Sequence, residues 1–177
     1  MRTIYRVLLV LLFGILTQAT SCEGDYPEQN YIMSEDNVPQ EPYLTTISAD
    51  YFQANIVQHG WKWKESWRID EKGVGVRYDA SNLSDYIPND LYFGADSMTV
   101  FMYKEASNER RTDSYFYDAT NNRIFSQAIV YMQLTYADSV NISFIEQLGN
   151  HYYKSYYERM LPYELNARWN GSKPEKP

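Results

Sequence analysis

Residues 60–73 read GWKWKESWRIDEKG, and this stretch predicts the fold more clearly than any other part of the chain. Alternate positions place Trp61, Trp63, Glu65, Trp67 and Ile69 on one face, with charged or polar residues on the other. Successive side chains of a strand point to opposite faces, so the alternation indicates a strand with an aromatic face. Residues 70–73 are typical of a turn, and alternation resumes over residues 74–79, so the whole stretch predicts a β-hairpin.

Further short strands are predicted at regular spacing after the hairpin, over residues 91–93, 98–103, 112–117, 129–136, 140–146 and 152–160. Many short strands separated by regular turn signals are typical of an antiparallel sandwich or barrel. The long helical patterns that connect the strands of a parallel sheet are missing. We therefore predict an all-β fold, a single antiparallel meander of about eight strands that closes into a small barrel, because closure removes exposed strand edges.

A short helix is predicted just before the barrel, over residues 48–59. Ser48 is a suitable N-cap because its hydroxyl can accept a hydrogen bond from the first helical turn. Tyr51, Phe52, Asn55 and Ile56 follow at near-helical spacing. Gly60 is expected to end the helix.

The N-terminus is typical of a bacterial lipoprotein signal peptide. Two arginines precede an apolar run over residues 7–16, and small residues lead to Cys22, the only cysteine in the chain. A transmembrane helix needs roughly twenty apolar residues, so this shorter run predicts a targeting segment and not an anchor. We expect residues 1–21 to be removed and Cys22 to carry lipid. Because Ala19 stands where such signals usually have Leu, ordinary cleavage near Ala19, which leaves a soluble protein, stays open.

Three regions are predicted after the signal peptide. Residues 22–45 carry acidic residues, amides and prolines with little apolar periodicity, so they are expected to form a flexible tether. Residues 46–168 are expected to form the barrel domain, and a chain of that size buries roughly two-thirds of its unfolded surface. Residues 169–177 are expected to be a disordered tail.

Composition excludes several classes of function. The chain has 16 Lys and Arg against 23 Asp and Glu, a formal net charge of −7, which repels phosphate backbones, so we expect no nucleic-acid partner. His59 and His151 stand alone in their segments, which argues against a zinc site. The sequence contains no calcium-binding loop, phosphate-cradling glycine loop or nucleophile elbow. We therefore expect no metal, no cofactor and no catalytic activity.

Residues 60–73 resemble the first hairpin of lipocalin-like domains in surface lipoproteins of Bacteroidetes, where a Gly-x-Trp or Trp-x-Trp strand runs into an Asp-x-x-Gly turn. Residues 112–122 resemble a middle hairpin of that group, and residues 156–160 resemble its closing strand, where Tyr-x-Arg is common. The resemblance covers residues 47–165 and implies a calycin-type barrel and, by analogy, a small apolar ligand. Residues 23–25 are similar to the acidic surface-export signal of these lipoproteins, and a solvated linker is the alternative.

Trp61, Trp63 and Trp67 are the candidate ligand-binding residues, together with Glu65 on the same predicted face. The aromatic side chains could form a ligand cup, or they could be the packed core of the barrel. A buried carboxylate is costly without a partner, a wet cavity or a raised pKa, so Glu65 is expected to orient the ligand. The alternatives for Glu65 are a solvated position near an open end and a pairing with an inward-pointing arginine.

The expected function is non-covalent binding of a small, partly apolar molecule by a lipid-anchored outer-membrane protein exposed at the cell surface, or else facing the periplasm. Contact with the membrane is expected only through the lipid on Cys22. A second hypothesis is an interaction or accessory protein of an envelope complex, with a filled barrel and contacts through outer loops at residues 81–90 or 104–110. A carbohydrate-binding module, suggested by the 18 tyrosines, and an enzyme are weaker alternatives. An internal cavity favours ligand binding, and a close-packed interior favours the interaction role.

Overall fold

The computed structural model describes residues 31–33, 38–41, 44–70, 73–83, 89–102, 109–127 and 129–172. The predicted signal peptide and Cys22 lie outside these described residues, as do residues 84–88 and 103–108 of the two outer loops.

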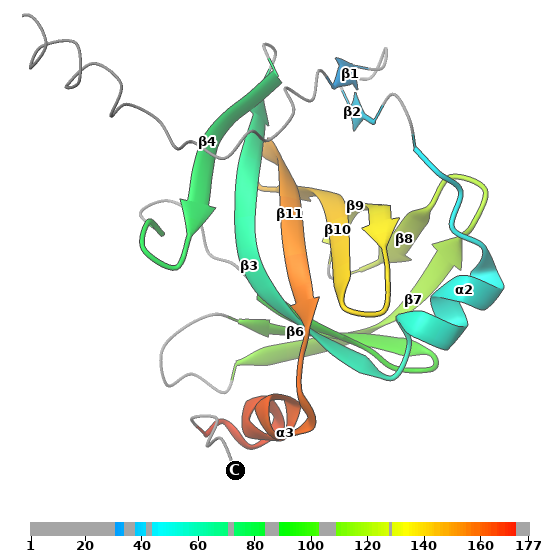
Figure 1. Cartoon of the computed structure of the whole chain (residues 1–177), viewed down its shortest axis with the longest axis vertical. Coiled ribbons are helices and arrows are strands. Elements are labelled where there is room, and N and C mark those ends of the chain that lie inside the picture. Colours follow the sequence, from blue (N-terminus) through cyan, green and yellow to red (C-terminus); the bar gives the residue numbers. More distant parts are fainter. Residues whose placement is uncertain are drawn as a thin grey trace, which may run out of the picture.

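The described elements are, in chain order, β1 (Ile32–Met33), β2 (Pro39–Gln40), α2 (Ala49–Asn55), β3 (His59–Asp70), β4 (Gly73–Asp79), β5 (Asn89–Phe93), β6 (Ser97–Met102), β7 (Arg110–Asp118), β8 (Arg123–Ser126), β9 (Ile129–Ala137), β10 (Asn141–Leu148), β11 (His151–Arg159) and α3 (Pro162–Asn170) (Figure 1). The predicted strands are all present. The short strand β8, the N-terminal pair β1–β2 and the helix α3 were not predicted.

Eight of these strands form a closed antiparallel barrel, which confirms the predicted all-β fold (Figure 1). The order runs from β11 through β10, β9, β8, β7, β6 and β5 to β3, and pairing of β11 with β3 closes the ring. Strand β3 is 12 residues long, so two strands pair with one of its edges. Its residues 59–61 pair with β5, and residues 65–70 pair with β4, a ninth strand outside the ring.

Helix α2 begins as predicted, because the Ser48 hydroxyl accepts a hydrogen bond from the Tyr51 amide at 3.2 Å. The predicted end at Gly60 is wrong, since the helix ends at Asn55 and the chain turns at Gln58, where φ is 67°. Gly60 lies in β3, where a Cβ atom would come within 2.7 Å of the Leu165 side chain in α3. Glycine at this position allows the close approach of the Leu165 and Met160 side chains and does not end a helix.

The barrel interior is filled by a cluster of apolar and aromatic side chains from α2 and the strands. Phe52 of α2 stacks on Tyr117 of β7 with ring centroids 4.0 Å apart and meets Phe93 of β5 edge-on at 5.7 Å. The Tyr51 hydroxyl donates to the Ala137 carbonyl at the end of β9. Helix α2 therefore covers one end of the barrel, and each large side chain that it buries stabilises the fold by about 1.5–3 kcal/mol.

The described part of the segment that was predicted to be a flexible tether contacts the barrel. Strands β1 and β2 pair with each other as a separate two-stranded sheet. Tyr31 and Val38 pack against an outer cluster formed by Ile69, Tyr131 and Ile145. Residues of this outer cluster alternate along their strands with interior residues, so the N-terminal segment lies on the outer surface of the barrel.

Helix α3 packs against the outside of β3 and β5 at the C-terminus. The Arg168 guanidinium forms an ion pair with Asp90, which is buried in β5. The ring of Trp169 meets Tyr92 and Phe101 edge-on, at 5.4 and 5.0 Å between centroids. The helix ends at Gly171, where φ is 62°, so the ordered chain extends beyond the predicted domain end at residue 168.

Candidate functional site

Trp61 and Trp63 are part of the barrel core. Their exposed fractions are 0 and 3%, and both belong to the interior cluster. The Trp61 indole donates to the Ile56 carbonyl at 3.2 Å, and the Trp63 indole donates to the Ser66 hydroxyl at 2.8 Å. Each N–H thus has a protein partner, as buried indoles normally do, and the two rings form packed core and no open cup.

The prediction that Glu65 and Trp67 share a face with Trp63 is wrong. Trp63 pairs with Tyr157 of β11, but Glu65 pairs with Tyr156, because the register shifts between these two tyrosines. Adjacent tyrosines point to opposite faces, so the extra residue in β3 moves Glu65 and Trp67 to the outer surface. Ser66 takes the inward position in their place.

Glu65 pairs with Arg77 on the outer surface, whereas the alternative predicted for it was an arginine inside the barrel. The Glu65 carboxylate accepts a hydrogen bond from Arg77 Nε at 2.9 Å and from the Trp67 indole at 3.2 Å. The Arg77 guanidinium also lies over the Trp67 ring, 5.7 Å from its centroid. A buried carboxylate needs such a partner, and Arg77 supplies it.

Glu146 of β10 is the carboxylate that lies inside the barrel. It is 4% exposed and accepts hydrogen bonds from the Ser155 hydroxyl at 2.5 Å and the Tyr157 hydroxyl at 3.3 Å. The Ser155 and Ser66 hydroxyls are 2.6 Å apart, which extends the network to the Trp63 indole. Sequence reasoning missed Glu146, although Ile142, Phe144 and Glu146 alternate in the same way as residues of β3.

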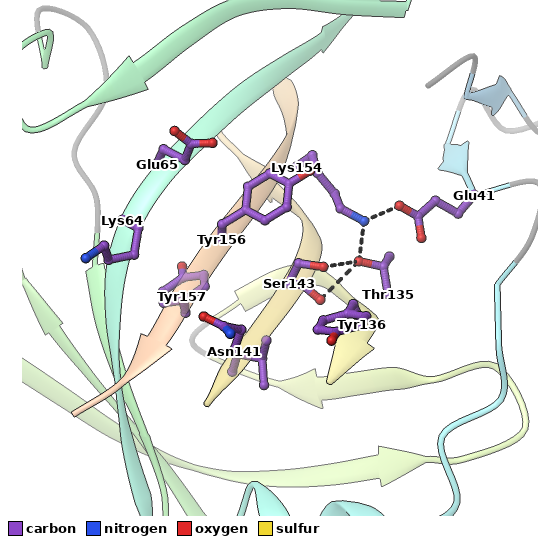
Figure 2. A pocket seen from close by; sticks show the side chains of 11 residues that line it. Glu41, Lys64, Glu65, Thr135, Tyr136, Asn141, Ser143, Lys154, Tyr156 and Tyr157 are labelled. Carbon is purple, nitrogen blue, oxygen red and sulfur yellow. Dashed lines mark hydrogen bonds and ion pairs between the residues drawn. The ribbon is translucent and has the colours of Figure 1, made fainter. Parts of the chain in front are cut away.

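A pocket of about 660 Å³ opens on the outer side of β3, β9, β10 and β11 and is also bordered by Ile142 and Tyr157 of the interior cluster (Figure 2). The residue Glu41, just after β2, contributes to its wall. The pocket is lined by Glu41, Lys64, Glu65, Thr135, Tyr136, Asn141, Ile142, Ser143, Lys154, Tyr156 and Tyr157. These residues combine aromatic surface with hydroxyls and charges of both signs, which is the lining that an amphipathic molecule requires.

Lys154 is a buried cation in the wall of this pocket. It is 3% exposed, forms an ion pair with Glu41 and donates to the Thr135 hydroxyl at 2.5 Å (Figure 2). Thr135 in turn donates to the Ser143 carbonyl at 3.0 Å. Burial lowers the pKa of Lys154, and the Glu41 carboxylate acts in the opposite direction.

A second pocket, of about 630 Å³, lies where α3 meets the ends of β3 and β11. Lys62 forms an ion pair with Glu164 at 3.0 Å in this pocket, and an Arg159 guanidinium nitrogen lies 2.6 Å from His59 Nε2. Burial and the Arg159 charge lower the pKa of His59. Within the described ranges, no three His, Cys, Asp or Glu side chains lie close enough together to hold a metal ion.

Neither a protein-family model nor a curated protein nor a solved structure matches the chain. Among the described residues, no helix has the length and apolar character that crossing a membrane requires.

Proposed function

We propose that this chain is a non-catalytic binding protein of the cell envelope that holds a small, partly apolar molecule in the pocket on the outer surface of β3, β9, β10 and β11. The observation that carries the proposal is the amphipathic pocket with a buried lysine in its wall, next to an interior already filled by core side chains. The proposed ligand site is therefore on the outer surface of the barrel and not in the barrel mouth, where the sequence predicted it. Of the four residues predicted to bind ligand, Glu65 lines this pocket.

The proposed location in the cell envelope is supported by the N-terminal sequence, which resembles a lipoprotein signal peptide. Lipidation of Cys22 is part of the same proposal. A lipocalin-like origin of the barrel is supported by the resemblance of residues 60–73, 112–122 and 156–160. Mass spectrometry of the protein from its host membrane should show acyl mass on Cys22 that a Cys22→Ala variant lacks. A wild-type protein without that mass would remove the envelope assignment and leave the pocket proposal standing.

The binding proposal is tested by calorimetric titration of a panel of lipids, bile acids, haem-like pigments and oligosaccharides. Asn141 is exposed and lines the pocket, so Asn141→Trp should fill the pocket without disturbing the core. We expect this variant to bind the best panel member roughly tenfold or more weakly, a loss of about 1.4 kcal/mol or more. Ser114→Trp, on exposed β7, is the matched control and should bind like the wild type. Equal binding by both variants, or no binding across the panel, would contradict the proposal.

A second candidate function, an interaction or accessory protein, is favoured by exposed apolar side chains on β7, β8 and β9. Phe116 is 65% exposed and Val130 81% exposed, and the Phe116 and Phe125 rings lie 6.5 Å apart. Large apolar side chains grouped on a surface are typical of protein-binding sites. If Phe116→Ser abolished co-purification of a defined envelope partner while Asn141→Trp did not, this second function would be preferred.

A further inference from the structure

The charge of Lys154 is balanced by a residue from outside the barrel. Its carboxylate partner, Glu41, belongs to the N-terminal segment and lies 113 positions away in sequence. The barrel itself supplies Lys154 with the neutral Thr135 hydroxyl and with the Tyr156 ring, whose centroid is 6.0 Å from Nζ. A buried ammonium group without an anion is costly, so the site requires one carboxylate at this point.

The segment that provides Glu41 lies outside the sheet of the barrel. Strands β1 and β2 have two residues each and form their own sheet, apart from the nine-stranded sheet of the barrel. Side-chain packing of Tyr31 and Val38 and the ion pair of Glu41 fix the segment to the outer surface. Because β1 and β2 pair with each other and not with the barrel sheet, an exchange of the Glu41 carboxylate for another carboxylate breaks no strand pairing of the barrel.

The other charged residues that line the pocket, Lys64 and Glu65, each have a partner of opposite charge on the surface. Lys64 is half exposed and pairs with Glu158 at 2.7 Å on the surface. Glu65, the other carboxylate of the lining, is already neutralised by Arg77. Without Glu41, the lining therefore has an unmatched positive charge at Lys154, next to the Thr135 hydroxyl.

We propose that the pocket takes a molecule with a carboxylate group, which replaces Glu41 on Lys154 and Thr135. The inference rests on the proposed function, because it names the chemical class of ligand for the same pocket. The apolar body of the molecule then lies between Tyr136 of β9 and Tyr156 of β11, which both line the pocket (Figure 2). When no ligand is bound, the Glu41 carboxylate occupies the position that the ligand carboxylate would take on Lys154.

The test compares matched pairs of probes that differ only in the head group: decanoate against 1-decanol, and 2-naphthoate against 2-naphthylmethanol. Affinities are measured by calorimetry on the full chain after signal removal. We expect the carboxylate of at least one pair to bind roughly tenfold tighter than its alcohol, since a single good ion pair in a buried site is worth a factor of that order. Lys154→Met should abolish this preference.

Glu41→Gln gives a second readout that does not depend on the folding of a Lys154 variant. Removal of the competing carboxylate should strengthen carboxylate binding several-fold and leave alcohol binding unchanged. The thermal stabilisation by decanoate should likewise be larger than in the wild type. Glu164→Gln, which removes a carboxylate of the second pocket, is the matched control and should change neither quantity.

The outcomes separate the two proposals. If alcohols and carboxylates bind equally and Glu41→Gln changes nothing, Glu41 is only a structural strap and the inference is overturned, while ligand binding in the pocket stands. If no member of either pair binds, and the wider panel is also silent, the proposed function is overturned together with the inference.

Discussion

Glu146 and Glu65 are carboxylates on opposite sides of the barrel wall, and their surroundings give them different roles. Glu146 faces the interior and accepts hydrogen bonds from the Ser155 and Tyr157 hydroxyls. Glu65 faces outward and is held by Arg77. Lys64 is the extra residue of the bulge in β3. It lies between Trp63, whose side chain points inward, and Glu65, whose side chain points outward.

We predict that Glu146→Leu lowers the free energy of unfolding by about 1–3 kcal/mol, because it leaves buried hydroxyls without their acceptor. Urea denaturation at pH 7 measures the change. Glu158→Gln serves as the control, since the exposed pair of Glu158 with Lys64 should contribute at most about 1 kcal/mol. Equal stabilities of the two variants would contradict a structural role for the interior network.

The alternation in residues 60–73 predicted the strand and the core positions of Trp61 and Trp63, but not the bulge. The reason is that both faces of β3 are covered. Ile69 packs under the N-terminal segment, and Trp67 lies against Arg77, so apolar residues are required on the outer face as well. A pattern of alternate apolar residues cannot distinguish inner from outer once both faces exclude water.

At the scale of elements, helix α3 is attached to the barrel through a buried ion pair. Asp90 is 2% exposed and accepts hydrogen bonds from the Trp63 amide at 2.8 Å and from Arg168 Nε at 2.6 Å. Burial raises the pKa of Asp90, although Arg168 and the Trp63 amide oppose the shift. Arg168, together with the Trp63 amide and Lys62, therefore favours the charged form of this carboxylate.

We predict that Arg168→Ala destabilises the fold by about 3 kcal/mol at pH 7, because it leaves the Asp90 carboxylate buried without its cation. A raised folded-state pKa gives stability that is present at low pH and lost as the pH rises through that pKa. The difference in free energy of unfolding between the wild type and the variant, measured by urea denaturation, should therefore become smaller as the pH is lowered from 7 to 4. A deficit that grows on acidification would show that Asp90 is not the group responsible.

Two elements outside the predicted meander show the limits of local patterns. Helix α3 had recognisable signals, since Pro162 stands at its start, Glu164 caps its first turn and Gly171 ends it. The helix has only nine residues, however, which is too few to show a clear helical period. Strand β8 is four residues long and follows Asn122, whose φ of 51° completes the turn, so it is too short to show any period.

At the scale of the whole molecule, long-range contacts decide the site. Closure of the ring could be predicted, because a meander of short strands must remove its edges. The pairing of Lys154 with Glu41 could not be predicted, because residues 22–45 have the composition of a tether. Only the folded arrangement brings Glu41, Thr135 and Lys154 together.

Buried tyrosines should make the barrel sensitive to alkali. Burial raises the pKa of Tyr115 and of Tyr117 to about 12, and their hydroxyls donate to the Gly94 and Ile47 carbonyls. A folded-state pKa above the usual value near 10 means that the unfolded chain releases these protons first, so stability falls as the pH rises from about 10 towards 12. Lys154 acts in the opposite direction at lower pH, up to its ordinary pKa of 10.5, because its pKa is lowered in the folded state.

The measurement is the free energy of unfolding in urea at pH 9 to 12. Tyr117→Phe should lower stability at pH 9, through loss of its hydrogen bond, and should make the decline above pH 10 less steep. An identical slope in the variant and the wild type would show that Tyr117 does not contribute to the alkaline transition.

The central claim is that ligands bind on the outer surface of the barrel and not within it. Chemical-shift mapping of the isotopically labelled protein during titration with decanoate tests this claim most directly. We predict that the shifts concentrate on Thr135, Ser143 and Lys154, with the methyl groups of the interior residues Met132 and Leu134 unchanged. Shifts that concentrate on those interior methyl groups and leave Lys154 unaffected would contradict the claim.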